Sequence, residues 1–263
     1  MESFNSRLER IVKERNSWLC VGLDISSEQL GISDINKLKD YTFSVIDATR
    51  ELAVAYKPNF AFFERWGSLG FDWLEKTITY IGDEHLTIAD AKRGDIGNTA
   101  EQYAKSIFGH FGFDSVTINP YMGSDSIKPF INEPDKGVFV LCRTSNYSAK
   151  ELQDRSVGGL PIYQLVADLV KNLNVLNNMG LVLGATKPNI LSNIRKIAPY
   201  IPFLIPGVGV QGGELSNCLK VGNKNGVGII NISRGISFVG DKSKKAIHSA
   251  AINYVEQMRE ILN

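Results

Sequence analysis

The chain has 263 residues, 43% of them hydrophobic, so it is long enough to bury one large core. Its formal net charge of +1 gives no general electrostatic attraction to nucleic acid or to an acidic membrane. No apolar run approaches the length needed to cross a bilayer. Three widely spaced cysteines without a Cys-x-x-Cys pair predict reduced thiols in a cytoplasmic protein, not a disulfide framework or a zinc site.

The first fifteen residues predict an amphipathic helix. Phe4, Leu8, Ile11 and Val12 recur at helical spacing among charged residues, so one apolar face can pack against the body of the protein. The segment lacks the apolar core of a signal peptide.

Beyond this helix, eight short runs rich in Val, Ile and Phe alternate with longer segments of helical period. The predicted strands are residues 18–23, 55–60, 86–89, 115–119, 138–142, 181–184, 203–205 and 228–232. The predicted helices include residues 35–53, 100–111, 161–179, 190–198 and 244–262. This alternation implies right-handed crossovers and a parallel sheet, and eight pairs fit a closed barrel better than an open sheet. We therefore predict an α/β chain that forms a single (β/α)8 TIM-barrel domain over residues 1–263.

The densest charged motif, DAKRGD at residues 90–95, follows the third predicted strand. In such barrels the chemistry takes place at the carboxyl ends of the strands. Residues two apart in an extended chain point the same way, so Asp90 and Lys92 can share one face of the barrel mouth. A purely structural alternative is that Asp95 and Thr99 cap the next helix and that Lys92 forms an ordinary ion pair.

The second predicted strand favours the functional interpretation of this motif. Lys57 stands there among apolar residues, where an unpaired ammonium would be costly. Asp90 on the neighbouring strand lies at the matching height and would remove that cost. We therefore predict an alternating array of Lys57, Asp90, Lys92 and Asp95 in a cleft, an arrangement typical of a functional site.

Glycines and an arginine follow the last two predicted strands, as PGVGVQGG at residues 206–213 and SRG at residues 233–235. Loops at these positions of a TIM barrel commonly bind phosphate through glycine amides, and Arg234 adds a bidentate cation. The Gly-x-Gly lacks the strand–helix unit and the distal acidic residue of a dinucleotide fingerprint, and taken alone it could be a plain turn. Together with Arg234 it favours a phosphorylated substrate.

The segment 87–100, with D-x-K-x-x-D-I-x-x-T at residues 90–99, resembles the signature of the orotidine 5'-monophosphate decarboxylases. The pieces GLD (22–24), KPN (57–59), CRTSN (142–146), PGVG (206–209) and RG (234–235) occur in that family's order, so the resemblance runs over nearly the whole chain. Thr-Ser-Asn after the fifth strand resembles the family's less common branch.

The resemblance implies an enzyme without cofactor or metal that converts orotidine 5'-monophosphate to uridine 5'-monophosphate and carbon dioxide in de novo pyrimidine biosynthesis. Lys92 would protonate the ring carbanion, and Asp90 would face the substrate carboxylate between Lys57 and Lys92. A homodimer with shared sites is implied, in which one subunit contributes residues to the other's pocket, namely Asp95, Ile96 and Thr99. The other implied contacts are to ribose (Asp24, Lys57, Asn59), to the pyrimidine edge (Thr144 or Ser145), to phosphate (Gln211, Arg234, Gly235) and, within the same substrate-binding set, Pro206.

Two other functions stay open on the sequence. Magnesium-dependent sugar-phosphate decarboxylases or aldolases of the same superfamily share D-x-K-x-x-D, but they carry a metal-binding glutamate where this chain has Lys57, and a lysine is hostile to a divalent cation. A non-catalytic sensor of a phosphorylated ligand is also compatible with the fold, although it would not need Lys92 between two carboxylates.

The segment 144–160 is polar, contains glycine and is long for a barrel loop. Long loops over a TIM-barrel site often close on the substrate, and we predict that this segment is a lid.

Overall fold

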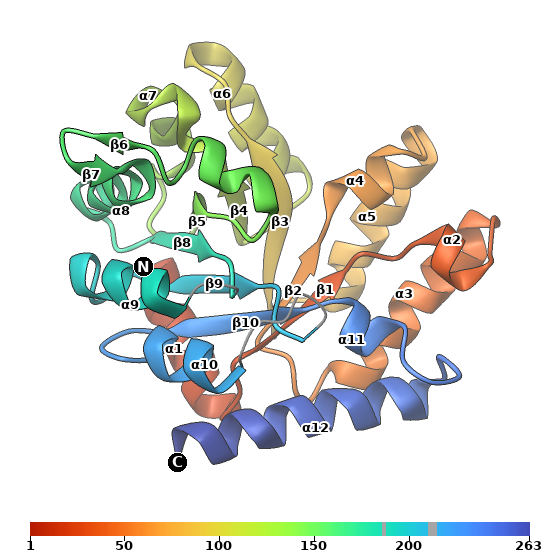
Figure 1. Ribbon diagram of the computed structural model, residues 1–263. Coiled ribbons are helices and arrows are strands. Elements are labelled where there is room, and N and C mark those ends of the chain that lie inside the picture. The colour runs from red at the N-terminus through yellow and green to blue at the C-terminus, as the bar shows by residue number, and fades with distance from the viewer. Residues whose placement is uncertain (186–187, 210–214) are drawn as a thin grey trace.

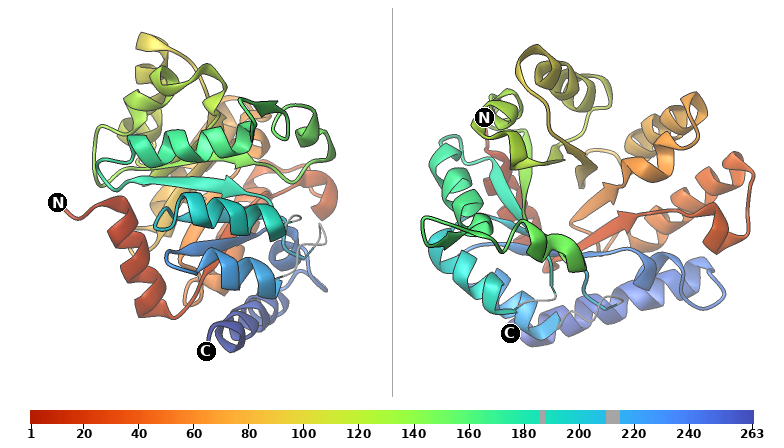
Figure 2. Two further views of the ribbon diagram at one scale, coloured as in Figure 1. Left: turned by 60° about the vertical axis from the view of Figure 1, so that its left-hand side comes forward. Right: turned by 45° about the horizontal axis from the view of Figure 1, so that its top comes forward.

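The computed structural model describes residues 1–185, 188–209 and 215–263. Within these ranges, parallel strands close into a barrel in the order β1-β2-β3-β4-β5-β8-β9-β10, with β10 pairing back to β1. Helices surround the strands on the outside (Figures 1 and 2). The predicted (β/α)8 architecture is therefore confirmed.

The barrel strands are short, and most of their residues are buried on both faces. That explains their continuous runs of Val, Ile, Leu and Phe, in which the alternation of a half-exposed strand is absent. Their bounds are β1 (Leu19–Leu23), β2 (Ala55–Pro58), β3 (Leu86–Arg93), β4 (Ser115–Ile118), β5 (Gly137–Arg143), β8 (Met179–Leu183), β9 (Phe203–Pro206) and β10 (Gly228–Ile232).

The outer layer consists of helices whose apolar stripes pack on the strands and on one another. The longer helices are α3 (Ile35–Thr49), α5 (Ser68–Ile81), α6 (Gly97–Ala104), α8 (Ile162–Leu173), α9 (Pro188–Ile197), α10 (Leu215–Gly222) and α12 (Lys244–Leu262). Shorter elements are α2 (Ser27–Leu30), α4 (Phe60–Glu64), α7 (Ser124–Ile127), α11 (Arg234–Ser237), a π-helix η1 (Lys105–His110), and the 3-10 helices η2 (Pro120–Met122), η3 (Lys128–Phe130) and η4 (Tyr147–Glu151). No helix of the described chain is both long enough and apolar enough to span a membrane.

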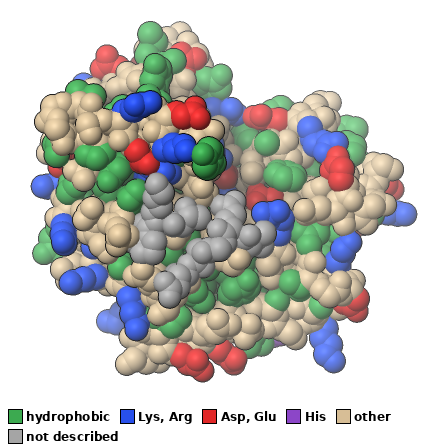
Figure 3. All heavy atoms as spheres, in the orientation of Figure 1, with side chains coloured by type: hydrophobic (Ala, Val, Ile, Leu, Met, Phe, Trp, Pro, Cys, Tyr) green, Lys and Arg blue, Asp and Glu red, His purple; other side chains and the backbone are tan. Residues whose placement is uncertain are grey.

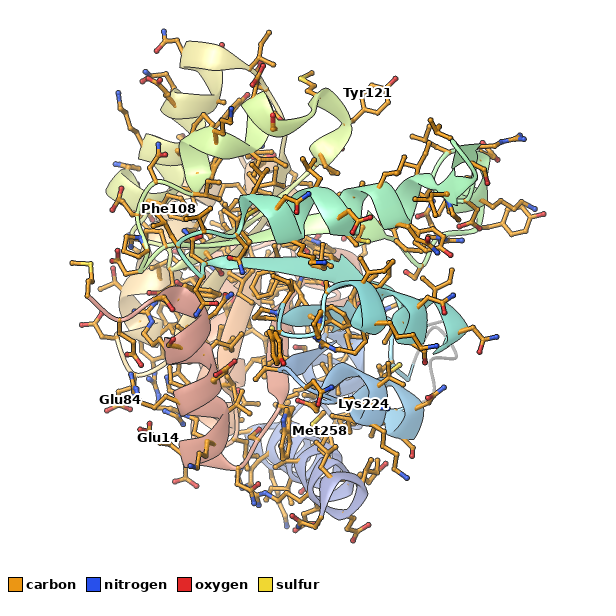
Figure 4. The ribbon with its side chains drawn as sticks, turned by 90° about the vertical axis from the view of Figure 1, so that its left-hand side faces the viewer. Glu14, Glu84, Phe108, Tyr121, Lys224 and Met258 are labelled. Atoms are coloured by element: carbon orange, nitrogen blue, oxygen red, sulfur yellow. The ribbon has the colours of Figure 1, made fainter. Side chains whose placement is uncertain are left out.

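The amino-terminal helix α1 (Phe4–Arg15) covers the end of the barrel at which the strands begin (Figure 4). Its four predicted apolar residues, Phe4, Leu8, Ile11 and Val12, are buried in one cluster with side chains from the barrel interior. The ring of Phe4 meets Phe139 of β5 edge-on, with the ring centroids 5.9 Å apart. This confirms the amphipathic helix and leaves the opposite end of the barrel for a ligand.

Two helices end earlier than the sequence predicts. The helix predicted over residues 35–53 ends at Thr49, and the larger difference is at α8. A single helix is predicted over residues 161–179, but α8 ends at Leu173 and β8 begins at Met179. The side chain of Asn174 accepts hydrogen bonds from the backbone N–H groups of Asn178 and Met179, both at 2.9 Å. Asn177 adopts a left-handed backbone conformation with φ 53°. These asparagines turn the chain into the next strand, because their short amides satisfy backbone donors that a continued helix would have used.

The third strand is longer than its apolar run. The sequence predicts a strand over residues 86–89, whereas β3 continues to Arg93 and so contains most of the charged motif. Its pairing with β4 shifts register between Ala89 and Arg93, so the strand bulges where Lys92 lies. Lys92 itself has a left-handed φ of 47° and is not regularly extended as predicted.

Candidate active site

Three charged side chains from neighbouring strands meet at the carboxyl end of the barrel. Lys57 of β2 forms an ion pair with Asp90 of β3, and the Nζ atom of Lys92 lies 2.5 Å from the other carboxylate oxygen of Asp90. A backbone bridge between Asn59 and Asp90 aligns the two strand ends. Asp90 thus holds one ammonium on each oxygen, and its pairing with Lys57 and with Lys92 agrees with the array predicted from the sequence.

Burial and charge oppose each other in this cluster. Burial by itself lowers the pKa of Lys57, which is 4% exposed, but the charges of Asp90 and Asp24 outweigh it and raise that pKa above its ordinary value. Burial likewise favours the neutral form of Asp90, and the charges of Lys57 and Lys92 outweigh it, so the pKa of Asp90 is lowered. Lys57 and Asp90 therefore both stay charged near neutral pH, and neither needs a metal to balance it.

Two cavities meet at this cluster, and each has a volume of about 170 Å³. The first, which we call the Arg234 cavity, is lined by polar backbone and side chains from the ends of β1, β9 and β10, including Asp24, Gly207, Ser233, Arg234 and Gly235. The second, the Lys92 cavity, has an apolar floor of Leu141, Val182 and Leu204 and a polar rim of Lys92, Thr117, Thr144 and Ser145. Lys57, Asp90 and Pro206 line both. On the face seen in Figure 3, acidic and basic side chains lie side by side near the centre of the view.

The Arg234 cavity offers cationic and amide donors to an anion. Arg234 is exposed and forms no ion pair with any carboxylate in the described part of the chain. A Cβ atom at Gly235 would lie 2.7 Å from the hydroxyl of Tyr254, and one at Gly209, where φ is +89°, would lie 3.1 Å from the same hydroxyl. No sequence motif marks Tyr254 of α12, whose hydroxyl packs against both glycines. Only glycine leaves room for backbone amides and the tyrosine together.

Asp24 follows β1 and lines the Arg234 cavity. Its Oδ1 atom is buried and accepts no hydrogen bond from any described residue. A buried acceptor without a donor is costly, so this oxygen is suited to receive a hydroxyl group of a bound ligand.

The Thr144–Ser145 pair divides its hydrogen bonds unequally. The Thr144 hydroxyl lies 2.6 Å from Asn146 Oδ1, and its backbone N–H donates to the Gln153 side chain at 2.8 Å. The Ser145 hydroxyl bonds to no other residue in the ranges described, and Ser145 packs so closely on β8 that a Cβ atom at Gly184 would lie 2.8 Å from its backbone nitrogen. Ser145 is therefore the residue left with hydrogen-bonding capacity toward the Lys92 cavity.

Several predicted residues are not brought into these cavities. Asp95 forms no ion pair within the described chain and accepts only from the backbone N–H of Ile96, so the four-member array has three members in a single chain. Ile96 is 58% exposed, and Thr99 is also exposed. The Asn59 side chain caps α4 by accepting from the backbone N–H of Ala61. Gln211 lies outside the described residues.

The predicted lid segment is folded against the barrel. Arg143 Nε lies 2.7 Å from Asp154 Oδ1, which joins the end of β5 to the segment. The segment continues through η4 and a hairpin of β6 (Ser156–Val157) with β7 (Leu160–Pro161). Its closure over a ligand stays a prediction.

The donor chemistry of the site does not suit a divalent metal. Asp90 has an ammonium group on each of its oxygens, and a cation there would be repelled by both. Among the described residues, no group of three or more His, Cys, Asp or Glu side chains is placed to hold a metal ion.

Comparison with known proteins agrees with this geometry. Residues 17–248 match the model of the orotidine 5'-phosphate decarboxylase / HUMPS family. The chain belongs to this family.

Individual members of the decarboxylase family match nearly the full length of the chain. The orotidine 5'-phosphate decarboxylase of Cupriavidus necator is 41% identical, over 99% of this chain and 98% of that protein. That of Christiangramia forsetii is 44% identical over 90% of each. The solved structure of the Leishmania donovani OMP decarboxylase is 38% identical, superposes with a TM-score of 0.89 and covers 98% of both chains.

The buried charge cluster predicts that removing Asp90 lowers the stability of the protein. Asp90→Ala leaves Lys57 buried without its nearest counter-charge, and we expect the free energy of unfolding to fall by about 3–5 kcal/mol. The matched control is Asp72→Ala, which removes an exposed partner of Lys76 at 2.6 Å and should cost about 0–1 kcal/mol. Urea denaturation at pH 7 measures both, and equal losses would contradict the buried-pair assignment.

Proposed function

We propose that this chain is an orotidine 5'-phosphate decarboxylase that converts orotidine 5'-monophosphate to uridine 5'-monophosphate and carbon dioxide in de novo pyrimidine biosynthesis, without cofactor or metal. The observation that carries the proposal is the position of the Lys57–Asp90–Lys92 cluster between two different cavities. One cavity offers Arg234 and glycine amides to a phosphate, and the other offers an apolar floor and a polar rim to a ring. A nucleotide fits this arrangement, with its phosphate in the first cavity, its base in the second and its sugar between them.

Lys92 would act at the reacting carbon. The bond between the ring and the carboxylate breaks, its electron pair stays on the ring carbon, and carbon dioxide leaves. The Lys92 ammonium stabilises that developing charge and then transfers a proton from Nζ to the same carbon. Asp90 would face the substrate carboxylate, and it holds Lys92 at the site through the 2.5 Å ion pair.

The remainder of the nucleotide would bind at a distance from the bond that breaks. Arg234, Gly235 and Gln211 would bind the phosphate, with Pro206 at the junction of the two cavities. Asp24, Lys57 and Asn59 would bind the ribose, for which the unpaired Oδ1 of Asp24 provides an acceptor. Ser145 would bind the pyrimidine edge, because the Thr144 hydroxyl is already engaged. Binding energy gained at these contacts can position the ring and close the site.

The active unit would be a homodimer with shared sites. Asp95, Ile96 and Thr99 lie beyond the end of β3 and outside their own chain's cavities. Large apolar side chains are exposed after the neighbouring strands β3 and β4, with Ile96 58%, Tyr121 78% and Met122 53% exposed. Figure 4 shows the Tyr121 side chain projecting away from the body of the protein. Exposed apolar side chains that cluster in this way are typical of an interaction surface. We place this single-domain enzyme in the cytoplasm, where its three buried cysteines stay reduced.

The direct test is the loss of orotidine 5'-monophosphate absorbance with purified protein in excess chelator. We expect full turnover with the chelator, because no step of the mechanism uses a metal. Lys92→Ala should lower kcat by more than the roughly 10²–10⁴-fold typical of general acid catalysis, because the lost charge also stabilised the carbanion. Activity restored only by magnesium would support the sugar-phosphate alternative, and tight nucleotide binding without carbon dioxide release would support the sensor.

Arg234→Ala tests the phosphate assignment. We expect weaker nucleotide binding and a lower kcat, because phosphate binding energy helps to assemble the site. Steady-state kinetics should show only a small effect on a truncated substrate without phosphate. Equal losses on both substrates would instead assign Arg234 a structural role.

A mixing experiment tests the shared sites. In a dimer of one Lys92→Ala protomer and one Asp95→Ala protomer, one site receives both lesions and the other receives neither. Random exchange makes about half of the dimers mixed, so activity should recover to at most about a quarter of the wild-type value. The control is each variant incubated alone. No recovery after verified subunit exchange would place Asp95 in its own chain's site.

A further inference from the structure

The backbone of Lys92 has a conformation that its side chain does not favour. Its φ of 47° lies in the left-handed region, which residues other than glycine, asparagine and aspartate seldom occupy. Such a conformation costs free energy and persists only where surrounding groups hold it. Groups around Lys92 must therefore hold its backbone in this conformation.

The backbone pairing between β3 and β4 does not hold Lys92 directly. β3 and β4 pair at Ala89 with Val116 and again at Arg93 with Ile118, and the register shifts between these pairs. The backbone N–H of Lys92 instead donates to the Thr117 side chain, with 2.9 Å between N and Oγ1. Thr117 is 2% exposed and stands on β4 opposite the bulge. Its hydroxyl therefore takes the place of a missing ladder acceptor.

The same hydroxyl also reaches the carboxylate partner of Lys92. Thr117 Oγ1 lies 3.3 Å from Asp90 Oδ1, the oxygen that pairs with Lys92, and 3.4 Å from the carbonyl oxygen of Ala89. A hydroxyl has one proton to donate, and it can accept the N–H of Lys92 at the same time. Thr117 thus connects the backbone of Lys92 to the carboxylate that holds its ammonium.

The residue after Lys92 is fixed independently. The carbonyl oxygen of Arg93 accepts the N–H of Asn119 at 2.8 Å. The Arg93 guanidinium lies 2.8 Å from Glu64, and it is within about 5 Å of the ring centroids of Phe60 and Tyr103. Lys57 holds Asp90 on one side and Arg93 is held on the other, and between them the Thr117 hydroxyl accepts the backbone N–H of Lys92.

We propose that Thr117 is a positioning residue, which holds Lys92 in its left-handed conformation so that the ammonium stays beside Asp90 and points at the reacting carbon. This inference rests on the proposed decarboxylase function. Half of the Lys92 side chain is exposed, so little packing restrains it. Without the Thr117 hydroxyl the backbone can relax, and the ammonium at the end of a long flexible side chain moves away from the reacting carbon. Misplacement by about 1 Å can slow a reaction by roughly a hundredfold.

The experiment compares three variants. Thr117→Val removes the hydroxyl and keeps the shape, and Thr117→Ser keeps the hydroxyl. The matched control is Thr87→Val on β3, the strand that carries Lys92. Thr87 is 3% exposed, accepts the backbone N–H of Asp114 at 3.0 Å and donates to the Asp114 carboxylate at 2.9 Å, but it lines neither of the two cavities.

Steady-state kinetics on orotidine 5'-monophosphate, uridine 5'-monophosphate affinity and urea unfolding are measured for each. We expect kcat of Thr117→Val to fall by about ten- to a hundredfold, with KM and nucleotide affinity within about threefold of wild type. Thr117→Ser should retain kcat within about threefold, because it restores the acceptor. Thr87→Val should lose a similar amount of stability and keep the wild-type kcat.

Three results would overturn the inference. The first is a kcat of Thr117→Val within twofold of wild type, and the second is an equal fall of kcat in Thr87→Val. The third is a loss of nucleotide affinity as large as the loss of kcat, which would make Thr117 a ligand contact. A wild-type protein that does not decarboxylate the nucleotide would instead refute the proposed function, so the two failures are distinguishable.

Discussion

The site depends on one carboxylate that is held between two ammonium groups in a buried position. Asp90 pairs with Lys57 on one oxygen and with Lys92 on the other, and burial makes the charges of Lys57 and Asp90 costly without their partners. The Lys57–Asp90 pair joins the carboxyl ends of β2 and β3, which the backbone bridge between Asn59 and Asp90 also aligns. Asp90 also holds the Lys92 ammonium beside the cavity where a carbanion would form.

The second constraint is the close approach of other groups to the backbone at two glycines that are far apart in the sequence. Gly184 lets Ser145 pack on the end of β8, and Gly235 admits the Tyr254 hydroxyl beside the backbone of α11. A side chain at either position would collide with a group that lines or supports a cavity. The outer helix α12 thus takes part in shaping the anion side of the site, although no motif marks its tyrosine.

Much of the fold and the centre of the site could be predicted from local pattern. The eight apolar runs, the lysine inside the second of them and the charged motif after the third identify a barrel in which Lys57 pairs with Asp90. The end of α8 could not be found in this way, because side-chain caps from Asn174 override the apolar period that suggested a longer helix. The extent of β3 was missed for a similar reason, since charged residues continue a strand that the apolar pattern ends.

The sequence by itself determined the type of barrel, the family and the identity of the central charges, because hydrophobic period and the D-x-K-x-x-D spacing are local properties. Only the tertiary structure decided the backbone conformation of Lys92, its hydrogen bond to Thr117 and the hydrogen bond that engages the Thr144 hydroxyl. Each of these depends on a hydrogen bond or contact between residues of different elements or at a loop. Asp95 shows the difference between sequence and structure. The motif suggests that it lies with Asp90 and Lys92, but in the folded chain it lies outside both cavities. The spacing of residues along the chain does not predict such contacts, because the distances between these side chains are set only when the barrel closes.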